Sequence, residues 1–175
     1  MPRSLLITFL LILSCPLGCS SSPRADLFLT TGYCPCGECN GYATGHALFL
    51  YIDRWNKKIN YGPHKGEKYT GKTAGGHHLR APQSFIFSPS SLKHPLQFSA
   101  RLVRPWKWPS QRGTIAADTN YYPLGTKMIV EGWGKGIVDD RGGAIKGPRR
   151  LDLFFARHSQ ADAWGRKMAC VEIED

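Results

Sequence analysis

The stretch that decides the fold is GTIAADTNYYPLGTKMIVEGWGKGIVDDRGGAIKGPRRLDLFF, residues 113–155. Short apolar runs alternate in it with turns rich in glycine and proline, which is typical of a small β-barrel and not of an α/β fold. Three aspartates, Asp118, Asp140 and Asp152, each lie in or beside one of these runs. Because the turns fix the backbone between the runs, we expect the three carboxylates to be brought to one groove.

Strand alternation predicts how the acidic side chains point. In the run RLDLFF at 150–155, Asp152 falls on the face opposite to its leucine neighbours. Apolar surroundings disfavour an ionised carboxylate and raise its pKa, as a general acid requires. The same alternation directs Asp139 away from Asp140, which predicts that Asp139 faces solvent.

The flanking sequence predicts further regular structure. Apolar and periodic patterns indicate a strand, a short amphipathic helix and a loop, in that order, at 27–33, 46–55 and 56–71. A capping-box signature at 159–162 predicts a short helix to about Lys167, followed by a last strand at 170–173. Residues from about 80 to 112, rich in proline and aromatic side chains, predict an inserted arm.

The N-terminus has the pattern of a secretory leader. One arginine precedes an apolar run at 5–13 that is too short to span a bilayer as a mature helix. Cys15 fits the lipid-attachment pattern better than Cys19, which has a proline three residues before it. We expect a leader over 1–19, lipidation at Cys15 (or Cys19) and a polar tether over 20–26, with ordinary signal cleavage as the alternative.

The 175 residues leave room for one domain, and the composition is basic. Lysine and arginine number 23 against 13 acidic residues, a formal net charge of +10. Such a surface favours an anionic partner. No nucleic-acid motif is present, so carboxylates of a cell-wall polymer or an anionic lipid surface fit an exported chain better.

Four cysteines of the exported domain are candidates for disulfides: Cys34, Cys36, Cys39 and Cys170. Export favours disulfides over a metal site. A zinc site would need a fourth ligand to join the first three cysteines, from Cys170 or from a histidine such as His77 or His78. Free thiols are a third reading.

The run KTAGGHH at 72–78 combines small residues, a hydroxyl and two histidines. Small residues let a backbone approach a ligand closely, and histidines add donors or a base. The alternative is a glycine turn beside exposed histidines.

These segments together resemble the three-aspartate (3D) domain, the double-psi β-barrel of membrane-bound lytic transglycosylase A and of related cell-wall proteins of spore-forming bacteria. The matching pieces are GTIAAD at 113–118, PLGT at 123–126, GWG at 132–134, DRGGAIKG at 140–147 and LDLFF at 151–155, with TGYCPC at 31–36 and TAGG at 73–76 upstream. Gly75 stands where the family usually has serine, and one residue is inserted around Pro148. The resemblance implies an all-β fold over 27–175: a six-stranded double-psi β-barrel with one or two short peripheral helices and a long inserted loop.

The resemblance also implies a reaction, the non-hydrolytic cleavage of the β-1,4 bond between N-acetylmuramic acid and N-acetylglucosamine in peptidoglycan. One carboxyl group serves as acid and then base, and no metal or cofactor is required. By the family's pattern Asp152 is that group, with Asp140 and Asp118 beside it as further catalytic residues. Tyr33, Thr73 and Lys146 are expected substrate contacts.

Two other readings stay open. The barrel could bind wall polysaccharide without cleaving it, or it could hydrolyse the bond with a second carboxylate. A lipid-anchored position on the periplasmic face of the outer membrane, with glycan strands as partner, follows from the leader together with the resemblance.

Overall fold

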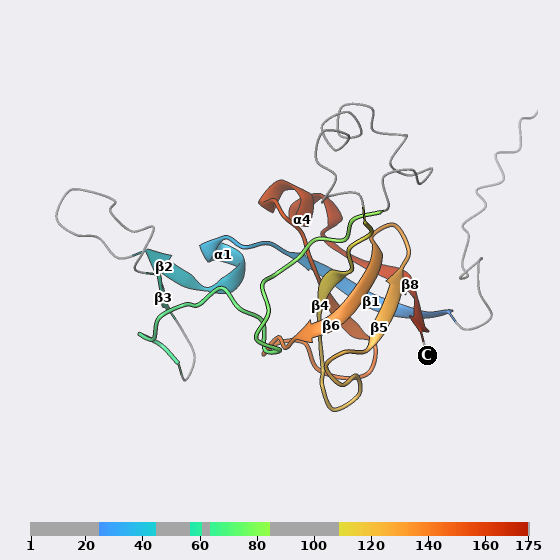
Figure 1. Ribbon diagram of the computed structural model, residues 1–175, viewed down its shortest axis with the longest axis horizontal. Helices are drawn as coiled ribbons and strands as arrows, with labels where there is room; N and C mark the ends of the chain where they lie inside the picture. The colour runs from blue at the N-terminus through green and yellow to red at the C-terminus, as the bar shows by residue number, and fades with distance from the viewer. Residues whose placement is uncertain (1–24, 45–56, 61–63, 85–108, 175) are drawn as a thin grey trace, which may run out of the picture.

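Six strands close into a barrel in the computed structural model, which describes residues 25–44, 57–60, 64–84 and 109–174 (Figure 1). The strands are β1 (Ala25–Tyr33), β4 (Gly113–Ala117), β5 (Lys127–Val130), β6 (Gly134–Asp140), β7 (Arg150–Phe154) and β8 (Arg166–Glu174). Around the barrel their order is β1, β7, β4, β6, β5, β8. The predicted all-β class and the six-stranded barrel are confirmed.

Two of the six pairings are parallel, β1 with β7 and β4 with β6. The other four are antiparallel and complete the ring. Parallel neighbours carry their carboxyl ends to the same edge. The chain that leaves β1 after Tyr33 therefore lies beside the chain that leaves β7 after Phe154.

The interior of the barrel is filled by apolar side chains that alternate along the strands. The buried cluster consists of Phe28, Ile115, Ala117, Met128, Val130, Val138, Leu151, Leu153, Ala169 and Val171. All six strands contribute to it, so closure of the ring and burial of the core are one event. Leu151 and Leu153 are fully buried while Asp152 between them points to the other face, as alternation predicts.

Smaller elements lie outside the ring. The hairpin of β2 (Tyr42–Thr44) and β3 (Lys57–Ile59) projects to one side, and the short helix α1 (Gly37–Asn40) joins it to β1 (Figure 1). The helix α4 (His158–Trp164) connects β7 to β8. None of the helices formed by the described residues has the length and apolarity needed to cross a membrane.

Some sequence predictions differ from the structure at the level of detail. The predicted loop at 56–71 contains β3, because Lys57–Ile59 pairs with β2. The capping box at 159–162 does not form: α4 begins one residue earlier, after an N-cap at Arg157 without a side-chain hydrogen bond. The leader, the lipidation sites, the tether as far as residue 24, the helix at 46–55 and most of the arm lie outside the described residues.

Replacement of Leu153 by alanine tests the core. We expect Leu153→Ala to lower the free energy of unfolding by about 2–5 kcal/mol, because it leaves a cavity where all six strands meet. Leu124→Ala is the matched control, since Leu124 is 44% exposed, and should change stability by less than about 0.5 kcal/mol. Urea unfolding followed by circular dichroism measures both, and equal losses would contradict this description of the core.

Candidate functional site

A row of outward-facing residues crosses four neighbouring strands. Thr31 of β1 lies opposite Asp152 of β7, Asp152 lies opposite Ala116 of β4, and Ala116 lies opposite Asp140 of β6. Asp140 and Asp152 thus flank one small residue. Two strand spacings separate their backbones, roughly 10 Å. The structure therefore brings two of the three predicted catalytic aspartates to one face of the barrel.

A β-bulge puts Asp140 on that face. Ile115 pairs with Val138, but the next residue, Ala116, pairs with Asp140, so Asp139 is an extra residue on β6. Ile115 and Val138 both belong to the interior cluster, whereas Ala116 packs outside it. Regular alternation after Val138 would turn Asp140 inward. The bulge resets the alternation and gives Asp140 the orientation of Asp152.

Asp152 lies in a half-buried, mostly apolar setting. The Thr31 hydroxyl donates a hydrogen bond of 2.8 Å to its Oδ1. Burial raises the pKa of Asp152 above its ordinary value, and the negative charge of Asp140 adds to the increase, while the Thr31 hydrogen bond opposes it. A carboxyl group with this bias holds its proton at higher pH than a surface aspartate.

Asp140 is more fully engaged than Asp152. Its Oδ1 accepts from the backbone amides of Ala74 at 3.0 Å and Arg141 at 2.9 Å, and its Oδ2 accepts from the Tyr33 hydroxyl at 3.5 Å. Burial again raises its pKa, with the charge of Asp139 contributing, against the lowering effect of the two amides. Both of its oxygens are therefore committed to hydrogen bonds with the protein.

Tyr33 lies between the two acidic groups. Burial raises the pKa of its hydroxyl, and the charges of Asp140 and Asp152 raise it further. Its ring is buried and meets the Phe154 ring edge-on at 5.4 Å. Tyr33 was predicted as a substrate contact, and in the structure its hydroxyl is directed to Asp140.

Asp118, the third aspartate, is held in a different way. It follows β4 directly, and its two oxygens accept from the backbone amides of Asn120 at 3.1 Å and Gly147 at 3.0 Å. These amides and the nearby charge of Lys146 lower its pKa. Asp118 is thus an ionised residue that fixes the 141–149 loop, with the exposed Lys146 beside it.

Residues of the turn at 73–77 form hydrogen bonds with both adjacent aspartates of β6. Thr73 Oγ1 donates to Asp139 Oδ2 at 3.0 Å, His77 Nδ1 lies 2.8 Å from Asp139 Oδ1, and the Gly75 amide donates to the Asp139 carbonyl at 2.9 Å. The same turn supplies the Ala74 amide to Asp140. The prediction that Asp139 faces solvent is wrong: it is 6% exposed, because the bulge breaks the alternation on which that prediction rests. Thr73, also buried, is used within this turn.

Gly75 is the residue at which the turn leaves no room for a side chain next to Asp139. A Cβ at Gly75 would lie 2.2 Å from Asp139 Oδ1 and 3.2 Å from the Asp139 carbonyl oxygen. A serine at this position would therefore displace Asp139. The His77–Asp139 pair therefore depends on glycine at position 75, because a side chain there would occupy the space of the Asp139 carboxylate.

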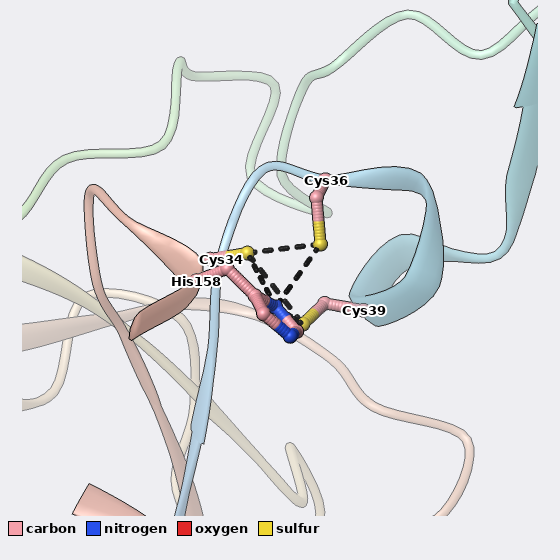
Figure 2. A group of neighbouring side chains, drawn as sticks. All are labelled: Cys34, Cys36, Cys39 and His158. Carbon is pink, nitrogen blue, oxygen red and sulfur yellow. Dashed lines mark hydrogen bonds between the residues drawn. The ribbon is translucent and has the colours of Figure 1, made fainter. Parts of the chain in front are cut away.

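The cysteines after β1 do not form the predicted disulfides. Cys34, Cys36 and Cys39 are free, and Cys34 Sγ lies 3.0 Å from Cys36 Sγ and 3.6 Å from Cys39 Sγ, whereas a disulfide needs about 2.05 Å. Their sulfur atoms surround His158 Nδ1 of α4 (Figure 2). The parallel pairing of β1 with β7 brings this histidine in. The fourth candidate, Cys170, is disulfide-bonded elsewhere.

A cavity of about 430 Å³ is lined by the end of β7 and by loop residues, but not by Asp140 or Asp152. Phe154, two residues beyond Asp152 on the same face of β7, lines it together with Tyr69 and three basic or ionisable side chains, Lys57, His78 and Arg80. Burial, then the neighbouring Tyr42 and Asp140, raise the pKa of Tyr69 to about 12. Tyr69 thus lines the cavity and also lies near enough to Asp140 for the charge of Asp140 to affect its pKa.

Fold and site together define a small six-stranded β-barrel that presents two protonatable aspartates on its outer face. Residues 113–173 match the model of the 3D domain family, so the resemblance carried by the three aspartates is confirmed for this segment. The match begins with β4 and ends within β8.

Two relatives from Bacillus subtilis (strain 168) match over 59 residues, 34% of this chain. YabE, whose name assigns it provisionally to cell wall shaping, is 48% identical, and the cell wall-binding protein YocH is 46% identical. The matched segments make up 14% and 20% of those proteins. The crystal structure of MltA from E. coli aligns with 38% of this chain and 25% of its own, at 21% identity and a TM-score of 0.30.

Sequence reasoning missed four residues of these sites: Thr31, Asp139, His77 and His158. Thr31 and His77 had a signal, since they lie in the quoted segments TGYCPC and KTAGGHH. The burial of Asp139 depends on a bulge, and the approach of His158 to the cysteines depends on a parallel pairing between strands more than 100 residues apart; local patterns encode neither.

The raised pKa of Asp152 predicts a stability gain when its charge is removed. A carboxyl group whose folded pKa exceeds its unfolded pKa stabilises the fold at low pH and loses that contribution as pH rises through the folded value. Asp152→Asn should therefore be more stable than wild type at pH 7, and the difference should vanish near pH 3.

Asp118→Asn is the control with opposite sign, because a lowered pKa means that the charge of Asp118 stabilises the fold at neutral pH. Thermal unfolding of the variants and of the wild type at pH 7 and pH 3 measures these differences. An Asp152→Asn variant that is less stable than wild type at pH 7 would contradict a raised pKa at Asp152.

Gly75→Ala tests the steric link to Asp139. The added Cβ must push the Asp139 carboxylate off His77 and Thr73, so we expect a loss of about 1–3 kcal/mol in the free energy of unfolding. Gly143→Ala is matched, since nothing lies within 4 Å of the Cβ position there. Chemical denaturation of both variants measures the difference, and a Gly75→Ala variant as stable as Gly143→Ala would refute the clash.

Proposed function

We propose that this protein is an exported lytic transglycosylase that cleaves the β-1,4 bond between N-acetylmuramic acid and N-acetylglucosamine in peptidoglycan. The observation that carries the proposal is the pair Asp140 and Asp152 on one face of the barrel, both with raised pKa values. The 3D domain match and the cell-wall names of YabE and YocH support the substrate.

Asp152 is the better candidate for the acid. It needs a proton to give and an oxygen able to reach a substrate. Asp140 accepts from one hydroxyl and two backbone amides, whereas Asp152 accepts from the Thr31 hydroxyl and from the Leu153 amide. Asp140 then acts by charge, since it raises the pKa of Asp152.

The proposed reaction balances without water. Protonated Asp152 gives its proton to the glycosidic oxygen, and the bond from that oxygen to C1 of the muramic acid breaks. The C6 hydroxyl of the same sugar attacks C1, and its proton passes to the Asp152 carboxylate. The products are a free 4-hydroxyl on one strand and a 1,6-anhydro sugar on the other. Asp152 ends as it began.

The remaining predicted residues take supporting roles in this proposal. Tyr33 and Thr73 are buried and bonded to the aspartates of β6, so we assign them to positioning and not to direct substrate contact. Asp118 holds the 141–149 loop, which carries Lys146 at the surface. Lys146 stays a candidate for contact with the glycan.

The cavity lined by Phe154, two residues beyond Asp152 on β7, fits a substrate of this kind. Its volume of about 430 Å³ accommodates one or two sugar rings, aromatic side chains line one part, and Lys57, His78 and Arg80 line another. Aromatic faces pack on sugars, and cations complement the carboxylates of lactyl or peptide groups. The net charge of +10 acts in the same direction.

The place of action follows from the same proposal. A wall substrate requires export, which the leader at 1–19 provides, and lipid attachment at Cys15 (or Cys19) would hold the barrel at a membrane face next to peptidoglycan. We propose an envelope location on these grounds, on the periplasmic face of the outer membrane where the cell has one.

A second candidate function is binding of peptidoglycan without cleavage. The specific observation in its favour is that YocH is named a cell wall-binding protein. Such a protein would retain the cavity but would not need a raised pKa at Asp152.

Analysis of the reaction products distinguishes cleavage of peptidoglycan from binding without cleavage. We expect digestion of purified peptidoglycan by the wild-type protein to release 1,6-anhydro muropeptides, identified by mass spectrometry. Asp152→Asn should lower the rate by a factor of about 100 or more, because general acid–base catalysis contributes about 10²–10⁴. Its binding to sedimented peptidoglycan should persist.

Asp26→Asn is the control for this measurement, because Asp26 is an exposed acid near the start of β1, outside both the acidic pair and the cysteine cluster. Reducing-end products would assign a hydrolase. Binding of the wild-type protein without soluble product would assign the non-catalytic function, and full activity of Asp152→Asn would remove Asp152 from its role.

A further inference from the structure

We propose that Cys34, Cys36, Cys39 and His158 bind one Zn²⁺ ion in a closed, structural site. The three sulfur atoms and the imidazole Nδ1 all lie within 4.8 Å of one another. They come from the loop after β1 and from the first residue of α4, and they converge on a common centre (Figure 2). This inference concerns the stability of the fold and does not depend on the proposed reaction.

The distances between donor atoms fit tetrahedral zinc. With Zn–S near 2.3 Å and Zn–N near 2.0–2.1 Å, a tetrahedron has S···N edges of about 3.6 Å and S···S edges of about 3.8 Å. The three S···Nδ1 distances are 3.5, 3.4 and 3.6 Å, and Cys34 Sγ to Cys39 Sγ is 3.6 Å. The 3.0 Å between Cys34 Sγ and Cys36 Sγ would have to open on binding.

The far side of the imidazole is arranged as metal-binding histidines require. His158 Nε2 lies 3.2 Å from Asp162 Oδ2 and 3.4 Å from Glu38 Oε2. These carboxylates accept the Nε2 proton and so leave a lone pair on Nδ1, directed at the sulfur atoms. A carboxylate on the second nitrogen fixes the tautomer and increases the basicity of the ligand.

The loop that carries the cysteines is built to hold them close. Asn40 donates through Nδ2 to the carbonyls of Cys34 and Cys36, the latter at 3.2 Å, and through its amide to Cys36 at 3.1 Å. Gly41 then turns the chain with φ of 59°, a left-handed conformation that favours glycine. The spacing Cys-x-x-Cys across α1 is one that zinc sites use.

Zinc also explains how these thiols persist in an exported chain. An oxidising compartment converts close pairs of free thiols to disulfides, and three cysteines cannot all pair among themselves. Zn²⁺ would take three thiolates and one neutral imidazole and release the three thiol protons to water. With four protein ligands the ion has no open position, which defines a structural and not a catalytic site.

The site would tie the end of β1 to the chain after β7. Cys34 follows Tyr33 directly, and the Phe155 amide donates to the Tyr33 carbonyl at 2.8 Å where the parallel pairing ends. A zinc ion at this point fixes the strand ends that carry Tyr33 and Asp152.

Metal analysis of the full chain tests the proposal without any substrate. We expect about one zinc per chain by inductively coupled plasma mass spectrometry after purification without chelator. Exchange with Co²⁺ should give the visible bands of tetrahedral cobalt and a thiolate charge-transfer band. Zinc removal should lower the melting temperature, and added Zn²⁺ should restore it.

Variants of the histidine provide the controls. His158→Ala should lose most of the zinc, and His158→Cys should retain it, because sulfur can replace the nitrogen. His64→Ala alters a histidine that pairs only with exposed Glu67 among the described residues and should leave zinc content unchanged. Absence of zinc after incubation with Zn²⁺, together with disulfides among Cys34, Cys36 and Cys39 found by peptide mass spectrometry, would overturn the site.

Discussion

The bulge between β4 and β6 is the constraint on which the candidate site depends. A regular pairing would turn Asp140 into a core filled by Ile115 and Val138, where an ionised carboxylate would carry a large desolvation cost. One extra residue, Asp139, moves Asp140 to the outer face beside Ala116. As a consequence, Asp139 itself becomes buried, and a buried carboxylate requires hydrogen-bond partners. The turn at 73–77 provides them, because its hydroxyl, imidazole and amide groups bind Asp139.

The three aspartates of the 3D motif therefore have three different electrostatic settings. Backbone amides around Asp118 lower its pKa, whereas burial raises the pKa of Asp140 and of Asp152, with the charge of Asp139 adding to the first increase and the charge of Asp140 to the second. Two like groups with raised pKa values share a site most easily when only one is ionised. The two groups differ in their hydrogen bonds: Asp140 accepts from the Tyr33 hydroxyl and from the amides of Ala74 and Arg141, whereas Thr31 is the side-chain donor to Asp152. One motif thus places three residues of the same type in three different environments.

Much of this could be predicted from the sequence, because the strands are local patterns. Alternation gave the orientation of Asp152, and the spacing of turns gave the barrel. Two predictions failed at features of long-range register. Regular alternation predicts that Asp139 faces solvent, but a bulge interrupts it; and the expected export, which favours disulfides for Cys34, Cys36 and Cys39, gives no information on His158, which lies more than 100 residues away. A bulge and a parallel pairing leave no signature within a window of a few residues.

The parallel pair β1–β7 is where the cysteine cluster and the acidic pair meet. β1 contributes Thr31 and Tyr33, which touch the two acids, and its next residue is a proposed zinc ligand. β7 contributes Asp152 and continues into the helix that holds the other ligand. The Tyr33 hydroxyl is 3.5 Å from Asp140, a long hydrogen bond that a small shift of β1 would break. A rigid cross-link one residue beyond Tyr33 is therefore placed where it can set the geometry of the acids without contacting them. The same reasoning explains why a closed zinc site, inert in chemistry, belongs at this edge of the barrel and not at the opposite one.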